Sequence, residues 1–292
     1  MLSQKSIYIE VHPMCPQPNR CDREHIMPKK KREVQTISSA ITEGVYRAYE
    51  SRLCNEIKKF PVPRHVAVIM DGNRRFAESL GMDPSQGHVL GRDKLEELIG
   101  WCLDLNIKIL TVYAFSTENL RRTSKELKML MDLFAINFHD IGDDERIHKN
   151  HIRIRAIGQV ELLPKTVQDA IHYAEKRTKN YKDYHFNIAI AYGGREEIVE
   201  AIKQMAKDAK AGKINPEKID QKTVSSYLYT KDVPDPDLIL RTSGEERISN
   251  FLLWQLAYAE LYFADVYWPG LRKVDFLRAI REYQKRQRRF GK

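Results

Sequence analysis

The stretch HVAVIMDGNRRFA, residues 65–77, decides how this chain is interpreted. Residues 66–70 are apolar and include β-branched side chains, which is typical of a strand buried on both faces. Asp71, Gly72, Asn73 and two arginines follow directly. Such a strand end points at a ligand in a parallel sheet, and its guanidinium groups favour phosphate. Asp71 is then a candidate ligand for Mg²⁺. From this stretch alone, an ordinary strand–turn–helix with Asp71 as N-cap is an equally good interpretation.

The composition narrows the class of protein. The chain has 292 residues, enough for one large or two small domains, and its net charge of +9 indicates an anionic partner. Four cysteines without metal-ligand spacing predict a reducing, intracellular compartment, and Cys102 is expected to be a buried thiol. No apolar run has the length of a membrane span, and the N-terminus lacks the apolar core of a signal peptide.

Residues 1–60 are expected to be an N-terminal extension. A short strand at residues 7–11 is followed by prolines and a lysine run, which predict loop and partial disorder. Residues 34–59 carry an amphipathic helical stripe. That helix packs on the main domain or lies on a membrane surface, and we favour packing.

From residue 61 to residue 292, β-rich runs alternate with helical stripes. The predicted strands are 66–70, 107–114, 152–157, 186–191, 238–240 and 261–266. The predicted helices are 88–105, one that starts in a capping box at 123–126, one opened by Pro164, and 195–210, 251–259 and 274–289. This alternation predicts an α/β fold with a six-stranded, mostly parallel, doubly wound sheet and surrounding helices.

Polar residues gather where four predicted strands end, at 71–75, 116–122, 192–195 and 241–247. The ends of parallel strands share one edge, so these arginines, hydroxyl groups and glycines are expected to converge on an anion with several phosphates. The helix after the second strand carries a long stripe of Leu, Met and Phe. Such a stripe is usually core, but beside an anion site it also suits an apolar tunnel for a hydrocarbon tail. Walker A and GxGxxG motifs are missing, which argues against an NTPase or a dinucleotide enzyme.

Four motifs resemble those of the cis-prenyltransferases, the undecaprenyl and dehydrodolichyl diphosphate synthases: residues 65–77, 113–119, 187–195 and 237–260. The resemblance covers roughly residues 61–292. It implies sequential head-to-tail condensation of isopentenyl diphosphate onto an allylic primer, farnesyl or geranylgeranyl diphosphate. The implied product is a long-chain (Z)-polyprenyl diphosphate, the precursor of a glycosyl carrier lipid. The resemblance also implies Mg²⁺ as cofactor, a homodimer, no nucleic-acid partner and a cytoplasmic enzyme, and it leaves peripheral membrane association open.

The resemblance assigns roles by motif position. Asp71 and Glu260 would hold Mg²⁺, and Asn119 or Asn73 is the candidate for proton removal. An amide is a poor base, so the released diphosphate is a third candidate. The residues assigned to the allylic substrate are Gly72, Asn73, Arg74, Arg75, Phe76, His88, Ser116, Thr117, Glu118 and Arg122. Those assigned to isopentenyl diphosphate are Arg241, Arg247, Ile248 and Ser249, with Arg289 and Gly291 of a C-terminal Arg-x-Gly motif that reaches the partner subunit's site.

Departures from the family pattern at residues 84–88, Leu120 and 138–150 leave the primer and the product length open. Two other functions stay in view. A non-catalytic regulatory subunit would keep the fold but lose the acid and arginines after the first strand, and Asp71 and Arg75 are both present. An RNA- or membrane-binding protein is suggested by positive charge alone, and its binding would depend steeply on salt.

Overall fold

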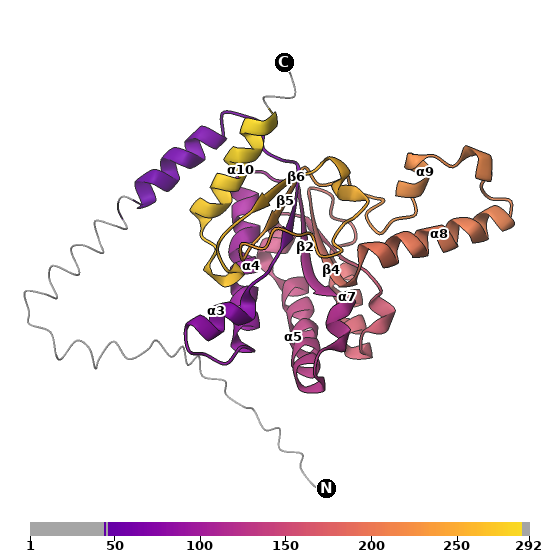
Figure 1. The fold of residues 1–292 in the computed structure, drawn as a ribbon, viewed down its shortest axis with the longest axis horizontal. Coiled ribbons are helices and arrows are strands. Elements are labelled where there is room, and N and C mark those ends of the chain that lie inside the picture. The colour runs from indigo at the N-terminus through magenta and orange to yellow at the C-terminus, as the bar shows by residue number, and fades with distance from the viewer. Residues whose placement is uncertain (1–43, 45, 288–292) are drawn as a thin grey trace, which may run out of the picture. The chain divides into compact units, whose positions relative to one another are not determined.

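Residues 44 and 46–287 are described by a computed structural model of the chain (Figure 1). The chain divides into two compact units, residues 1–52 and 53–292. In the first unit, residues 44 and 46–52 are helical, within the helix predicted over 34–59. The predicted strand at 7–11, the predicted loop that follows it, Arg289 and Gly291 lie outside the described residues. None of the helices described is both long enough and apolar enough to cross a bilayer.

One six-stranded sheet organises the described part of the second unit. Its strands are β1 His65–Ile69, β2 Ile109–Ser116, β3 Ile152–Ile157, β4 Tyr184–Tyr192, β5 Leu238–Arg241 and β6 Glu260–Phe263. They lie in the order β3-β4-β2-β1-β5-β6, and every neighbouring pair is parallel. The predicted α/β class is confirmed, and the sheet is wholly rather than mostly parallel.

Helices connect and surround the strands (Figure 1). Their bounds are α3 Asn73–Ser79, α4 Gln86–Asp104, α5 Ser124–Asp143, α6 Glu145–Lys149, α7 Lys165–Thr178, α8 Gly194–Lys210, α9 Gln221–Ser225 and α10 Lys273–Gln287. Short 3₁₀ helices lie at η1 Glu118–Arg121, η2 Val160–Leu162, η3 Pro216–Lys218, η4 Gln255–Tyr258 and η5 Trp268–Gly270. The prediction of a helix over 251–259 is wrong, since only the short 3₁₀ helix η4 forms there. Asn250 and Leu252 have left-handed backbones, with φ of 62° and 46°, which an α-helix does not tolerate.

Both faces of the sheet are covered, as expected for its central strand β1, whose five residues are all buried. On one face, Ala67 and Ile239, paired in register, pack in a buried cluster with Phe251 and Leu252. The segment after β5 therefore covers this face. On the opposite face, Val68 pairs with residues of β2 and β5 that are also fully buried.

The start of the second unit packs against α10. Leu53 and Ile57 are 1% and 0% exposed, and the buried Gln284 side chain donates a hydrogen bond of 2.9 Å to the Ile57 carbonyl. These contacts involve only the residues of the predicted helix from Leu53 onward, and the packing of the whole helix at 34–59 stays a prediction. Cys102 is buried in α4, as expected, and burial raises the pKa of its thiol.

Candidate active site

The backbone of Asp71 is fixed by the neighbouring strand β5. The Asp71 N–H donates to Thr242 Oγ1 at 3.0 Å, and the Thr242 hydroxyl donates to the Asp71 carbonyl at 2.7 Å. Gly72 follows with a φ of 103°, and a Cβ there would lie 2.7 Å from a ring carbon of Tyr267. Only glycine fits this left-handed turn, which lets α3 begin at Asn73.

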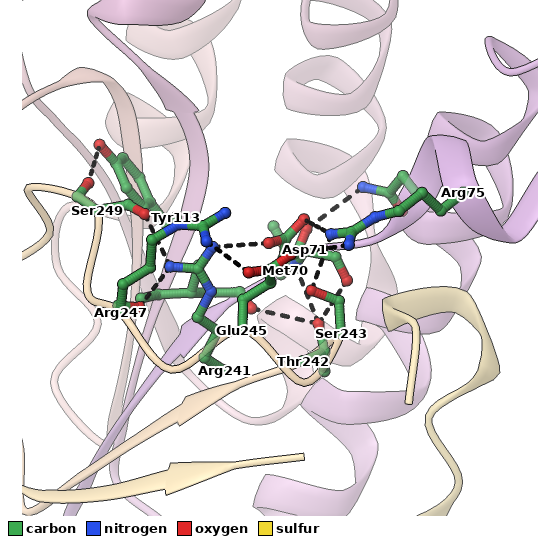
Figure 2. A network of polar contacts seen from close by, with 12 residues as sticks. Met70, Asp71, Arg75, Tyr113, Arg241, Thr242, Ser243, Glu245, Arg247 and Ser249 are labelled. Atoms are coloured by element: carbon green, nitrogen blue, oxygen red, sulfur yellow. Dashed lines mark hydrogen bonds and ion pairs between the residues drawn. The ribbon is translucent and has the colours of Figure 1, made fainter. Parts of the chain in front are cut away.

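Two arginines hold the Asp71 carboxylate, one on each oxygen (Figure 2). Arg75 donates to Oδ1 at 2.9 Å from the first turn of α3. Arg241 donates to Oδ2 at 2.7 Å from the end of β5. Burial acts to raise the pKa of Asp71, but hydrogen bonds and charge from Arg241, then Ser243 and Arg75, hold it below its usual value. Asp71 is therefore an anion at neutral pH.

These contacts close into a ring of five residues that we call the arginine ring (Figure 2). Arg75 also donates to Glu245 at 3.0 Å, and Glu245 accepts from Arg247. Arg241 donates to the Arg247 carbonyl and so returns the ring to Asp71. Three guanidinium groups face two carboxylates, which leaves one excess positive charge. Such a group suits an incoming anion such as a diphosphate.

The loop after β5 positions polar groups through an unusual backbone. Ser243, Ser249 and Asn250 all have positive φ, at 78°, 47° and 62°. Backbone strain of this kind in non-glycine residues clusters at functional sites. Its result here is that Ser249 Oγ accepts from Arg241 at 2.8 Å. The Asn250 amide donates to Glu118 at 3.3 Å.

A second cationic group surrounds Glu126. Arg122 donates to its carboxylate at 2.7 Å, and Arg74 and His88 lie 3.6 and 3.9 Å away. The predicted capping box is wrong, because the Thr123 side chain makes no cap bond and Glu126 turns to Arg122. Burial, followed by the charge of Arg122, lowers the pKa of His88 to about 4. His88 is therefore neutral at physiological pH.

The two asparagines considered for proton removal differ in whether their side-chain oxygens already accept a hydrogen bond. The Asn119 side-chain oxygen accepts from the Ser116 N–H at 3.0 Å, so it builds the turn after β2. The Asn73 side-chain oxygen is buried without a hydrogen-bond partner among the described residues. Buried polar atoms are rarely left unpaired. Asn73 therefore has an unpaired acceptor, which lies against Gly91 of α4 in the wall of the cavity.

A cavity of about 680 Å³ opens beside the Asp71 carboxylate. It is lined at this end by the predicted site residues Asp71, Asn73, His88, Ser116, Glu118, Asn119, Arg122, Arg241 and Ser249. Beyond them its walls are largely apolar, and they are formed by side chains of α4, α5, β2 and β4. An anion site and an apolar cavity are thus adjacent, as the sequence predicts.

Comparison with known proteins identifies the family. The family model described as "Putative undecaprenyl diphosphate synthase" matches residues 69–291. The chain belongs to the undecaprenyl diphosphate synthase family of cis-prenyltransferases. It is accordingly an enzyme that transfers prenyl groups and elongates a prenyl chain in the cis configuration.

Individual members of the cis-prenyltransferase family are similar to this chain in sequence and in structure. Two are named tritrans,polycis-undecaprenyl-diphosphate synthase (geranylgeranyl-diphosphate specific). The Methanopyrus kandleri protein is 56% identical over 85% of this chain and 92% of its own length. The Methanocaldococcus jannaschii protein is 57% identical over 85% and 90%. The crystal structure of lavandulyl diphosphate synthase from Lavandula x intermedia with dimethylallyl diphosphate matches at 37% identity and a TM-score of 0.72, over 76% of this chain and 95% of that one.

Within one protomer, Glu260 lies too far from Asp71 for the two carboxylates to bind the same metal ion. It pairs with Leu238 at the amino end of β5, and its carboxylate binds Arg286 at 2.8 Å. Residue 66 lies at the same level as Leu238, so Asp71 is about 16 Å further along the strand direction. Within one protomer the two carboxylates are therefore too far apart to share an ion, and the assignment of Glu260 to Mg²⁺ stays a prediction.

Other predicted residues surround the cavity without lining it. Arg75 and Arg247 belong to the arginine ring, and Arg74 reaches Glu126. The Phe76 ring lies beside Gly270, where a Cβ would be 3.1 Å from it. The remaining members are Gly72 in the turn, Thr117 before η1 and Ile248 in the loop after β5.

Sequence reasoning missed the residues that position the arginines. Thr242 fixes the Asp71 backbone, Glu245 bridges two arginines, Glu126 gathers a second cationic group, and Asn250 joins the loop to Glu118. The available signals were the position of Glu245 two residues before Arg247 and that of Glu126 four residues after Arg122, the helical spacing of an ion pair. Nothing in the residue types alone indicated the left-handed backbone of Asn250.

Proposed function

We propose that this cis-prenyltransferase condenses isopentenyl diphosphate repeatedly onto geranylgeranyl diphosphate. The product is a long-chain (Z)-polyprenyl diphosphate that serves as the precursor of a glycosyl carrier lipid. This primer is the one for which two relatives, each more than half identical to this chain, are named as specific. It replaces the open choice between farnesyl and geranylgeranyl diphosphate. The observation that supports the proposal most is the Asp71–Arg241 contact beside a largely apolar cavity.

The family uses a divalent cation, and we propose Mg²⁺ with Asp71 as its protein ligand. No group of three or more His, Cys, Asp or Glu side chains suited to a metal occurs in the described part of the chain. That fits Mg²⁺, which binds through one or two carboxylates together with substrate phosphates. The ionised Asp71 oxygens have lone pairs beyond those that the arginines occupy. When bound, the ion supplies positive charge that stabilises the departing diphosphate.

The chain's own residues divide the two diphosphates between them in this proposal. Arg241, Arg247 and Ser249 bind isopentenyl diphosphate, since they form one side of the arginine ring and its loop. Arg74, Arg122 and His88 face the allylic diphosphate. Substrate phosphates replace the carboxylates that now hold these arginines, at little reorganisation cost.

The allylic carbon loses its diphosphate and is attacked by the isopentenyl double bond, after which a proton leaves. Asn73 can accept a hydrogen bond near this centre because its side-chain oxygen lacks a partner. An amide is too weakly basic to keep the proton. The released diphosphate is therefore the final acceptor, and Asn73 orients the group that loses the proton.

A homodimer in which Arg289 and Gly291 reach the partner subunit's site remains part of the proposal, as does peripheral contact with a membrane surface. Both rest on the family resemblance of the C-terminal Arg-x-Gly sequence and on the basic composition. Deleting residues 289–292 is expected to raise the KM for isopentenyl diphosphate. An unchanged KM would contradict the role of the C-terminal tail.

The function is tested by incubating the purified chain with Mg²⁺, labelled isopentenyl diphosphate and single primers. Geranylgeranyl diphosphate is expected to give the highest kcat/KM and long cis products. Higher kcat/KM with farnesyl diphosphate would overturn the primer assignment. Absence of labelled polyprenyl product with every primer would overturn the function.

A further inference from the structure

The segment that follows β6 is bonded to both loops that carry the arginine ring. The Ser243 N–H, in the loop after β5, donates to the Val266 carbonyl at 2.7 Å. The Trp268 N–H donates to the Asp71 carbonyl, at the end of β1, at 3.0 Å. Tyr267 stands between these two bonds in the chain. Its backbone is therefore held on both sides, next to the turn after β1.

The aromatic ring of Tyr267 contacts two parts of the candidate active site. A Cβ added at Gly72 would lie 2.7 Å from a ring carbon of Tyr267 and 3.1 Å from its Cα, so the tyrosine packs directly on the turn after Asp71. Arg75 Cζ lies over the same aromatic ring, 5.5 Å from its centroid. A guanidinium group within about 6 Å of an aromatic centroid makes a cation–π contact.

Arg75 is held by two kinds of interaction that differ in what they require. Its N–H groups donate to Asp71, to Glu245 and to the Ser243 hydroxyl, at 2.9 to 3.0 Å (Figure 2). The attraction to the face of Tyr267 is electrostatic and needs no acceptor atom. Tyr267 therefore holds the guanidinium independently of the two carboxylates. The Arg75 side chain is 39% exposed, so an anion from solvent can reach it.

This difference matters when a diphosphate arrives. In the proposed function Asp71 turns to Mg²⁺, and phosphate oxygens accept the hydrogen bonds that the carboxylates accept now. An arginine without another contact would have to be ordered again by the substrate, and such ordering weakens binding. The face of Tyr267 keeps its contact with the cation throughout the exchange, because it competes for none of the N–H groups.

We propose that Tyr267 is a positioning residue for the allylic diphosphate, an inference that rests on the proposed function. Its aromatic ring holds the Arg75 guanidinium while Arg75 exchanges Asp71 and Glu245 for phosphate oxygens. Tyr267 acts through Arg75 and touches no reacting atom. Its loss is therefore expected to weaken binding of the allylic diphosphate and to leave the KM for isopentenyl diphosphate, assigned to other arginines, nearly unchanged.

Calorimetric titration of geranylgeranyl diphosphate in Mg²⁺ and detergent, without isopentenyl diphosphate, measures this binding directly. Tyr267→Met fills most of the volume without an aromatic face and is expected to raise the Kd about fivefold. Tyr267→Phe keeps the aromatic ring and should restore the wild-type Kd. An unchanged Kd in Tyr267→Met, or an equal rise in Tyr267→Phe, would overturn the proposal.

The matched control removes a cation–π contact far from the site. Lys108 Nζ lies 4.2 Å from the ring centroid of Tyr184, at the amino end of β4. Tyr184→Met is expected to leave the Kd for geranylgeranyl diphosphate unchanged, and a rise equal to that of Tyr267→Met would overturn the proposal. The thermal unfolding midpoint of each variant is measured in parallel, and Tyr267→Leu replaces Tyr267→Met should that variant unfold.

A double-mutant cycle tests whether Tyr267 acts through Arg75. In an Arg75→Met background, Tyr267→Met is expected to have little further effect on the Kd, because two residues that act through one contact are not additive. The same rise as in the wild-type background would overturn the proposed role.

Inorganic diphosphate with Mg²⁺ is the probe that separates this inference from the proposed function. Tyr267→Met is expected to weaken its binding, and Tyr267→Phe is not. If the wild type makes no polyprenyl product with any primer while this difference between the two variants holds, the proposed function fails and the positioning of Arg75 by Tyr267 stands. Equal binding of inorganic diphosphate by both variants and the wild type would overturn the positioning role.

Discussion

Arg241 Nη2 lies 2.7 Å from Asp71 Oδ2, and this contact joins the ends of two adjacent strands, β1 and β5. Arg241 is only 3% exposed, so its guanidinium is fixed by Asp71, Ser249 and the Arg247 carbonyl. Residues 170 positions apart in the chain thereby form one anion-binding centre.

Arg241→Lys should bind isopentenyl diphosphate poorly although the charge is kept. An ammonium group cannot reproduce the guanidinium fork, and one lost hydrogen bond to a charged group costs about 1.5–3 kcal/mol. The KM for isopentenyl diphosphate is expected to rise about 10- to 100-fold. Arg247→Lys is the comparison, because Arg247 is 60% exposed, and its effect should be smaller. Equal effects would contradict the central position of Arg241.

The acid limb of the pH–rate profile should move to higher pH in Arg75→Met. Charge and hydrogen bonding from Arg241, Ser243 and Arg75 lower the pKa of Asp71 against the effect of burial, so the wild type keeps its ionised carboxylate to unusually low pH. Removing one arginine raises that pKa, and activity is lost earlier as pH falls. The measurement is kcat/KM against pH. A limb that stays in place or moves to lower pH would show that Asp71 ionisation does not control it.

Gly87→Ala should destabilise the protein by about 1–3 kcal/mol through overpacking. A Cβ at residue 87 would lie 2.0 Å from the Asn73 backbone oxygen, so α3 and α4 would have to separate. In the same helix, a Cβ added at Gly100 would meet nothing within 4 Å. Gly100→Ala should therefore stabilise the protein by up to about 1 kcal/mol. Urea unfolding of both variants checks the pair. Similar free energies of unfolding would contradict the close contact at Gly87.

His65 should make the fold less stable in mild acid. Burial lowers its pKa to about 4, and its ring bonds Thr111 at 2.8 Å. As the pH falls below about 6.5, His65 is protonated in the unfolded chain but stays neutral in the folded one. The free energy of unfolding therefore decreases as the pH falls from 6.5 to 4. The loss from His65 is about 3 kcal/mol. His65→Gln should flatten this slope, whereas the exposed control His151→Gln should not. An identical slope in His65→Gln would exclude His65 as the cause.

Much of the fold is predictable from particular residues. The run at 66–70 indicated the central strand, and β1 is indeed buried throughout. Strand ends were less accurate: residues 107–108 precede β2, which begins at Ile109 opposite His65. An apolar pattern shows burial, and it does not show where pairing starts.

The site is predictable in its residue types and less so in its partners. Placing Asp71 and Arg241 at one sheet edge needed only parallel strands that end in polar residues. Motif order does not show that Glu260 begins β6 at the opposite edge, apart from Asp71 within one protomer. The pairing of Glu126 with Arg122 rather than Thr123 depends on a turn, η1, whose path the sequence does not reveal.

Prenyl transfer is expected to require the ionised Asp71 carboxylate, which two arginines hold beside the cavity. The most direct test is the rate at which Asp71→Asn incorporates labelled isopentenyl diphosphate into geranylgeranyl diphosphate with Mg²⁺, measured beside its thermal unfolding midpoint. Asp71→Asn is expected to fold and to lose about 100-fold or more in this rate. A folded Asp71→Asn variant with near wild-type turnover would contradict it.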